Sequence, residues 1–187
     1  ARDLFKILLA NYDQKLVPRK KICSVLWPDK ELSAANRNFH VTLNSLRKVL
    51  DPNRESRGQA VFIIRKGDCY GLAPHLSYDV KRFEAAVQRG QQAEKEQVTM
   101  KYYQQTVELY QGEFLVNDLS WEPIVKERQR LKKLFLTAAE NLIKYYYQKG
   151  EYQKTIKLTD KILQQDKYIE TAYLYKMKSY HSLGNKT

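Results

Sequence analysis

Prolines and tyrosines are distributed so unevenly along this chain that it divides into two parts near Pro74–Ser77. Four of the five prolines fall within residues 1–75, whereas twelve of the fourteen tyrosines fall within residues 76–187. A change of composition at a proline-containing stretch is typical of a domain boundary. Because 187 residues are enough for two small domains, we expect separate modules over residues 1–75 and 78–187.

The first part predicts three helices. Apolar residues at helical spacing indicate helices over residues 3–11 and 19–26, with Pro18 in the first turn of the second helix. Ser33 predicts the N-cap of a third helix, which ends at Asp51. On this helix, a 4-3-4 spacing of apolar residues indicates one buried face: Phe39, Leu43, Leu46 and Leu50.

Residues 61–72 predict a β-hairpin with basic residues beside its tip. Val61–Ile64 is β-branched and aromatic, and Cys69–Leu72 returns after the turn Arg65–Asp68. Residues 53–59, which precede the hairpin, are polar and predict a loop. The first module is therefore expected to contain three helices followed by a C-terminal hairpin.

The second part predicts helices throughout. Capping and stop signals indicate helices over residues 80–93, 98–110, 123–149, 151–165 and 169–183. Gly150 and Gly184, which end two of them, are 34 residues apart, and the same offset relates the pairs Tyr146/Tyr180, Ile143/Met177 and Thr137/Thr171. This offset is the period of tetratricopeptide repeats, in which helix pairs stack. We therefore expect a mostly α fold that ends in a tetratricopeptide-like repeat domain.

The charge of the chain favours a polyanionic partner. It has 33 lysines and arginines against 21 carboxylates, a formal net charge of +12. Residues 1–75 have 14 basic and 7 acidic residues, and residues 76–187 have 19 and 14. The first part is thus more basic per residue, which indicates that a partner such as nucleic acid binds there.

Several classes of protein are disfavoured by the sequence. No stretch approaches the roughly 20 apolar residues of a membrane span, and the chain does not start with a signal peptide. Cys23 and Cys69 are too few for a disulfide framework, and neither belongs to a metal-binding cluster. There is no P-loop, GxSxG motif or nucleophile–base pair, and three histidines lie outside any catalytic motif: His40, His75 and His181. We therefore expect that the chain is not an enzyme and that it binds neither a cofactor nor a metal ion.

Three helices and a basic hairpin resemble a winged helix-turn-helix of the OmpR type. The resemblance rests on Leu46–Leu50, followed after a loop by a strand, Lys66-Gly67 and Tyr70. The second part resembles the bacterial transcriptional activator domain in four segments: Tyr78–Phe83, Leu109–Leu115, Glu127–Leu131 and Lys149–Tyr152. This order of domains, over nearly the whole chain, is similar to that of the SARP/AfsR-type transcriptional regulators.

The resemblance implies a transcriptional regulator, an activator, that binds double-stranded promoter DNA. It implies that the helical domain self-associates, for example as a homodimer, and contacts RNA polymerase or a sigma factor. The expected location is the bacterial cytoplasm, at the nucleoid and not at a membrane. Two features depart from the family: its N-terminal sheet is missing, which indicates a fragment of a longer protein or a lost sheet, and Cys69 replaces the second glycine of the wing turn.

The residues expected to bind DNA belong to the second helix, the third helix and the hairpin. A helix fits the major groove, and by resemblance Arg37 is the candidate for a bidentate contact with guanine. Val41 suits a thymine methyl, whereas Arg47 and Lys48 suit phosphates, and the hairpin suits the minor groove. The full set is Arg19, Lys20, Lys21, Arg37, Asn38, His40, Val41, Thr42, Asn44, Ser45, Arg47, Lys48, Arg65 and Lys66.

Less specific interpretations remain open at this stage. Arg37 can lie in solvent or pair with Asp29 or Glu31, and the run Arg19–Lys21 can be an ordinary charged surface. Tyrosines at helical spacing pack between helices more often than they stack on bases. The alternative function is a tetratricopeptide-like protein-interaction scaffold without sequence-specific DNA binding.

Overall fold

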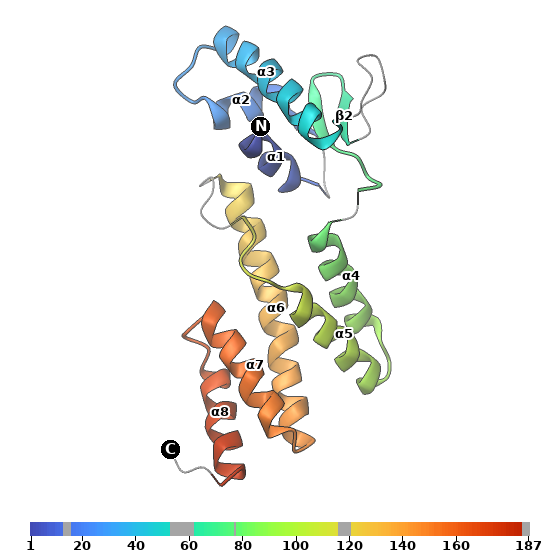
Figure 1. Ribbon diagram of the computed structural model, residues 1–187, viewed down its shortest axis with the longest axis vertical. Coiled ribbons are helices and arrows are strands. Elements are labelled where there is room, and N and C mark those ends of the chain that lie inside the picture. The colour runs from blue at the N-terminus through green and yellow to red at the C-terminus, as the bar shows by residue number, and fades with distance from the viewer. Residues whose placement is uncertain (13–15, 53–61, 77, 116–120, 185–187) are drawn as a thin grey trace. The chain divides into compact units, whose positions relative to one another are not determined.

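The computed structural model describes residues 1–12, 16–52, 62–76, 78–115 and 121–184 (Figure 1). The chain forms two compact units, one made of residues 1–76 and 115–127 and the other of residues 77–114 and 128–187. The first unit thus includes a segment from the second part of the sequence. Among the helices of the described residues, none is both long and apolar enough to cross a membrane.

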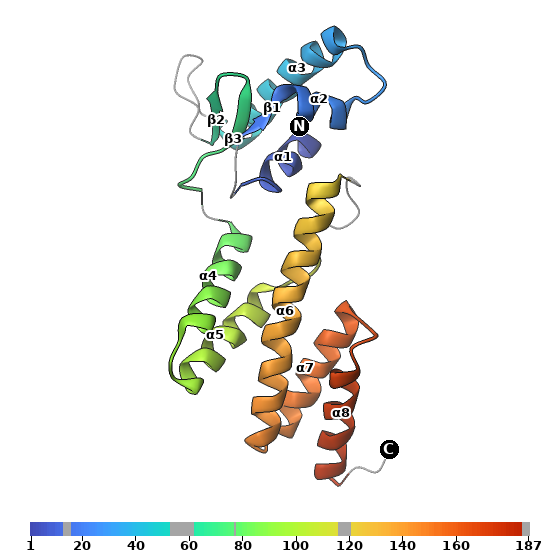
Figure 2. The ribbon, with the colours of Figure 1, turned by 180° about the vertical axis from the view of Figure 1, so that it is seen from behind.

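Three helices and a three-stranded antiparallel sheet make up the first unit (Figures 1 and 2). The elements are α1 (Arg2–Leu9), β1 (Val17–Pro18), α2 (Arg19–Leu26), α3 (Leu32–Leu50), β2 (Ile63–Lys66) and β3 (Cys69–Leu72). β3 is the central strand, because the strand order is β1-β3-β2. The sheet therefore has one more strand than the predicted hairpin.

The helix ends in the first unit follow the sequence prediction only in part. α1 spans Arg2–Leu9 and thus ends two residues before the predicted end at residue 11. α2 has the predicted bounds, and Asp51 is the C-cap of α3. The prediction of Ser33 as an N-cap is wrong, because Glu31 has that position and α3 begins one residue before Ser33. Pro18 is the N-cap of α2 and not its first-turn residue, since it belongs to β1. A strand of two residues is too short to show the alternation that predicts a strand.

The hairpin turns later than the sequence indicates. Arg65 and Lys66 belong to β2, and Lys66 pairs with Cys69 across a turn in which Gly67 has a φ of +59°. Glycine adopts this left-handed conformation without the steric cost of a Cβ atom. Cys69 has ordinary strand backbone, since Leu115 is the non-glycine residue with positive φ among those described. The predicted loop 53–59 and Val61 lie outside the described residues.

A line of α3 side chains forms the centre of the first core, as the 4-3-4 spacing predicts: Phe39, Leu43 and Leu46. Leu50 is only half-buried, at the last turn of the helix. Phe39 meets Tyr70 of β3 edge to face, with ring centroids 4.8 Å apart, a geometry that aromatic pairs prefer. Trp121, from the segment 115–127, packs against the same core.

The second unit is helical. Its helices are α4 (Asp79–Gln92), α5 (Glu96–Leu109), α6 (Glu122–Gln148, of which residues 128–148 belong to this unit), α7 (Tyr152–Gln165) and α8 (Glu170–Ser182). α4 packs against α5 and α7 against α8, as Figures 1 and 2 show. Gly150 and Gly184 follow α6 and α8 with φ of +74° and +78°, so both helices end where glycine predicts.

α6 contributes more buried apolar residues to the second unit than any other helix described, namely Leu131, Phe135, Ala138, Ala139, Leu142 and Ile143. Tyr110 stacks on Phe135 with ring centroids 4.3 Å apart. The 34-residue relation holds for the two terminating glycines and for Tyr146 and Tyr180, which are both half-buried, but it does not hold for the burial of every pair. Ile143 is fully buried, whereas Met177, its partner at that offset, is 59% exposed on α8.

Candidate nucleic-acid interface

Four side chains form a line along the exposed side of α3, which we call the outward line: Arg37, Val41, Asn44 and Lys48. Each of them precedes one residue of the buried 4-3-4 set by two positions. Because two residues turn an α-helix by about 200°, this line lies on the side of α3 opposite the buried residues. All four are therefore exposed, and Val41 is 68% exposed. Within the described part of the chain, Arg37 forms no ion pair with Asp29 or Glu31. The outward line is accessible to a ligand.

The flanks of the outward line differ in what they contact. Asn38, Thr42 and Ser45 lie on one flank, and His40 and Arg47 lie on the other. The Ser45 hydroxyl donates to the Val41 carbonyl at 3.0 Å, so its proton is used inside the helix. Thr42 is half-buried and lines a small hollow with Asp3 and Trp27. Thr42 therefore faces the body of the unit and not the outward line.

Arg19 connects the start of α2 to α3 and to the hairpin turn. Its Nε is 3.1 Å from a carboxylate oxygen of Asp68, and its backbone N–H donates to the Asp68 carbonyl at 2.9 Å. A terminal guanidinium nitrogen lies 3.2 Å from Nε2 of His40. Because an arginine only donates, Nε2 of His40 is the acceptor and the ring proton is on Nδ1. The structure thus brings together two predicted site residues, Arg19 and His40, and one residue that was not predicted, Asp68.

The neighbouring lysines of α2 have separate surroundings. Lys20 is exposed, and Lys21 lies 5.6 Å from the centre of the Trp121 ring, within reach of a cation–π contact. Since the Arg19 N–H already donates to Asp68, the first N–H of this helix is not available to a phosphate. The side chains of Lys20 and Lys21 are both exposed, whereas that of Arg19 is half-buried and contacts Asp68 and His40.

The two basic residues of β2 also have different surroundings. Arg65 donates through Nε to the Gly67 carbonyl at 2.8 Å, and its guanidinium lies 5.7 Å from the Tyr70 ring. Lys66 is exposed beside the turn. Arg65 therefore stabilises its own hairpin, whereas Lys66 has no ion pair among the described residues and is exposed beside the turn.

Cys23 belongs to the interior of the first unit. Its sulfur lies 3.7 Å from the Ala35 carbonyl, and burial raises the pKa of the thiol, an effect that the Arg19 charge partly offsets. A thiol with a raised pKa is a poor nucleophile at neutral pH. Among the residues that the structure describes, no three His, Cys, Asp or Glu side chains gather as metal ligands.

Two residues that contact the predicted site residues could not be predicted from the sequence pattern. Asp68 holds the hairpin turn to Arg19, and Trp121 covers part of the core beside Lys21. A turn aspartate indicates only a turn, and a tryptophan in a distant segment has no periodic partner. Both contacts join residues that are far apart in the sequence, so local patterns do not reveal them.

Comparison with known proteins concerns the helical part of the chain. Residues 78–187 match the family model of the bacterial transcriptional activator domain. The match starts at residue 78, one residue after the second unit begins. No curated protein matches the chain.

Proposed function

This chain belongs to the bacterial transcriptional activator domain family, which supports a regulatory role in transcription, and we propose that it is a DNA-binding activator. The family is one of regulatory domains and not of enzymes. In this proposal the first unit is a winged helix-turn-helix of the OmpR type, with α3 as the recognition helix and β2–β3 as the wing. The helical repeat domain provides self-association and contact with RNA polymerase or a sigma factor.

The outward line of α3 is the observation that supports DNA binding best. Its four side chains do not pack in the core, yet they include two cations, an amide and an exposed valine. An α-helix fits the major groove, where arginine pairs with guanine, asparagine with adenine and an apolar group with the thymine methyl. We assign these roles to Arg37, Asn44 and Val41, and phosphate contact to Lys48.

Contacts outside α3 are expected to hold the protein on the DNA backbone. Lys66 at the hairpin tip suits a phosphate or the minor groove, and Lys20 suits a phosphate. Asn38 and Arg47 lie on the flanks of α3, where groove walls would meet them. Arg19 and His40 contribute by holding the hairpin turn against α2 and α3. If about six phosphates are neutralised, the log–log slope of affinity against salt is about −5.

Selection from a random-sequence duplex library, followed by mobility-shift titration, tests the proposal. We expect a selected sequence to bind more tightly than a scrambled one. Arg37→Ala and Asn44→Ala should each reduce that preference by about 10-fold to 100-fold, the effect of about 1–3 kcal/mol of base discrimination. Lys48→Ala should weaken binding to both duplexes equally, because a phosphate contact does not depend on sequence.

Lys101→Ala is the matched control, since Lys101 is an exposed lysine of α5 in the second unit. It should leave both affinities unchanged within about twofold. If the protein shows no sequence preference at any salt concentration, the DNA-binding proposal fails. The chain would then fit the alternative of a tetratricopeptide-like interaction scaffold.

A further inference from the structure

The positive surplus of the helical part is confined to its last helices. Residues 141–182 contain eight lysines, no arginine and four carboxylates, whereas residues 78–140 contain ten basic and ten acidic residues. The same stretch, 141–182, contains eight of the fourteen tyrosines. The end of α6, α7 and α8 therefore form a lysine- and tyrosine-rich surface that is distinct from the outward line of α3.

Most carboxylates of this stretch already have a lysine partner. Glu151 pairs with Lys154, Asp160 with Lys176 at 2.6 Å, and Asp166 with Lys132 of α6 at 3.3 Å. Five other lysines have no ion pair with a carboxylate in the described part of the chain: Lys144, Lys149, Lys157, Lys167 and Lys178. Because no carboxylate of the described residues neutralises these five charges, they favour an acidic partner.

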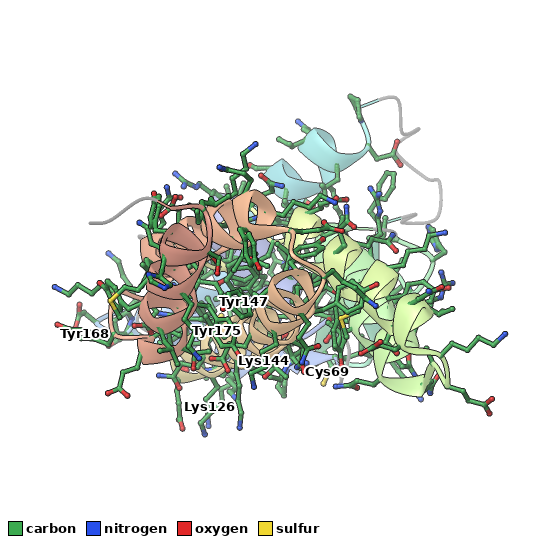
Figure 3. The ribbon with its side chains drawn as sticks, turned by 90° about the horizontal axis from the view of Figure 1, so that it is seen from below. Cys69, Lys126, Lys144, Tyr147, Tyr168 and Tyr175 are labelled. Atoms are coloured by element: carbon green, nitrogen blue, oxygen red, sulfur yellow. The ribbon has the colours of Figure 1, made fainter. Side chains whose placement is uncertain are left out.

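Three of these lysines lie over tyrosine rings. Lys149 is 5.5 Å from the Tyr145 ring centre, and Lys178 is 5.3 Å from that of Tyr175. Lys167 is 5.1 Å from the ring centre of Tyr168. Tyr147 meets Tyr175 edge to face at 5.3 Å between the helices, and Figure 3 shows these two side chains together. Ring faces that lysines cover are not available for stacking on bases.

α8 also has an exposed apolar face made of Tyr173, Leu174 and Met177, which are 47%, 44% and 59% exposed. Its buried side consists of small residues, Ala172 and Ser179. In Figures 1 and 2, α7 covers one side of α8, and α8 is at the edge of the second unit. Lys178 follows Leu174 by one helical turn and therefore borders the apolar face.

We propose that the exposed face of α8, together with Lys178 and the lysines that follow α6 and α7, Lys149 and Lys167, binds an amphipathic acidic segment of a partner protein. This inference rests on the proposed role of the helical domain in contacting a protein, and it does not depend on DNA binding. The partner's apolar side chains cover Leu174 and Met177, and its carboxylates pair with Lys149, Lys167 and Lys178. An amphipathic helix recognised by an apolar surface with a charged border is a common mode of binding.

The chemistry of the surface favours such a protein segment over nucleic acid. In the grooves of a nucleic acid the apolar side group is the thymine methyl, whereas a protein segment has branched aliphatic side chains to cover Leu174 and Met177. Arginine, whose planar group is suited to phosphates, is absent from residues 141–182. Lys149 and Lys178 also lie over one face of the Tyr145 and Tyr175 rings, where a base would otherwise stack.

Fluorescence anisotropy with labelled probes tests the inference. The main probe is a peptide of about 20 residues with leucines at helical spacing and glutamates between them. Comparison probes replace every glutamate by lysine, replace every leucine by serine, or consist of oligo(dT) of similar length. We expect the acidic amphipathic peptide to bind at least about tenfold more tightly than each comparison probe, and less tightly as salt screens the charges.

Variants of the full 187-residue chain separate the two components. Leu174→Ser combined with Met177→Ser should weaken peptide binding about tenfold or more, because the apolar area is no longer buried. Lys149→Gln combined with Lys178→Gln should weaken it about fivefold and reduce its salt dependence. Lys101→Gln, remote on α5, should change it less than about twofold. Met177→Lys also removes an apolar side chain from this face, but lysine has a higher helix propensity than serine, so α8 is retained.

Four outcomes would overturn the inference. One is equal binding of oligo(dT), weakened by the lysine variants but not by the serine variants, which would indicate nucleic acid. Another is self-association that the serine variants abolish, which would place a second copy on this face. Unchanged peptide binding in all variants, or loss of folding in Met177→Lys, would exclude an accessible docking surface. The mobility shift with duplex DNA, run in parallel, should stay unchanged and thus reports separately on the proposed DNA binding.

Discussion

α3 and α8 both expose lysines and apolar side chains, but they are built in opposite ways. α3 places its large apolar residues on one line and its polar residues on the other, so Phe39 is fully buried while Lys48 is exposed. α8 buries Ala172 and Ser179 and exposes Tyr173 and Met177. Packing thus accounts for Phe39, Leu43 and Leu46 on α3, whereas it does not account for Tyr173, Leu174 and Met177 on α8.

This difference shows how far amphipathicity identifies a functional surface. On α3 the outward line is left over after the core is filled, so its residues can serve a ligand without cost to stability. On α8 the larger apolar residues are exposed, and an exposed apolar face indicates a site where a partner binds. Stability measurements on both helices test this contrast.

Substitution of Phe39 by alanine is expected to give the largest effect. Phe39→Ala should destabilise the first unit by about 3–5 kcal/mol, because a fully buried ring is replaced by a cavity beside Tyr70. Both tryptophans, Trp27 and Trp121, belong to the first unit, so urea unfolding followed by tryptophan fluorescence reports on it.

Val49→Ala on the same helix is the control. Val49 is 73% exposed, and its loss should change the unfolding free energy by less than about 0.5 kcal/mol. A large effect of Val49→Ala would contradict the separation of the two faces of α3.

Alkaline pH should destabilise the second unit through Tyr110. Burial, and secondarily the Glu113 charge, raise the pKa of Tyr110 to about 12. Between pH 10 and 12 the unfolded chain releases this proton while the folded chain keeps it, so stability falls as pH rises. The loss is about 2–3 kcal/mol by pH 12.

Tyr110→Phe should remove this part of the pH dependence. Among the described residues the Tyr110 hydroxyl has no hydrogen-bond partner, and the ring stacks on Phe135, so stability at pH 7 should be equal or slightly higher. Urea unfolding at pH 7 and above pH 10, followed by far-ultraviolet circular dichroism, measures both effects. If Tyr110→Phe lost as much unfolding free energy above pH 10 as the unchanged protein, groups other than Tyr110 would cause the alkaline destabilisation.

Two substitutions on α8 compare its inner and outer sides directly. Ala172→Leu should cost about 1–3 kcal/mol, because a larger side chain overfills the contact with α7. Met177→Leu, on the exposed face, should change stability by less than about 0.5 kcal/mol. Circular dichroism during urea unfolding measures each. If Ala172→Leu and Met177→Leu lowered the free energy of unfolding equally, the exposed face of α8 would have to be covered by another segment.

The smallest expected effect concerns the link between the hairpin and α3. Arg19→Met removes the contacts with Asp68 and His40 but keeps most of the aliphatic stem, and should cost about 1 kcal/mol or less because the pair is partly exposed. Lys20→Met, at the exposed neighbour, serves as the control. Tryptophan fluorescence gives the free energy, and amide exchange in β3 should accelerate in Arg19→Met alone.

Much of the local structure can be predicted from the sequence because it depends on near neighbours. Helical spacing identifies the bounds of α2 and the buried line of α3, and Gly150 and Gly184 identify two helix ends. The short strand β1 has no such signal, since it exists only by pairing with β3. The exposure of Met177 is likewise not visible from its 34-residue relation to Ile143.

The sequence by itself therefore determined most of the helices, the greater positive charge of the first part and the buried line of α3. These features follow from spacing, turn residues and charge, which act over a few positions of the chain. Only the tertiary structure decided that Arg19 engages Asp68 and His40, that Trp121 joins the first core and that α8 leaves an apolar face exposed. Each of these depends on which distant segments meet, and that is fixed by packing.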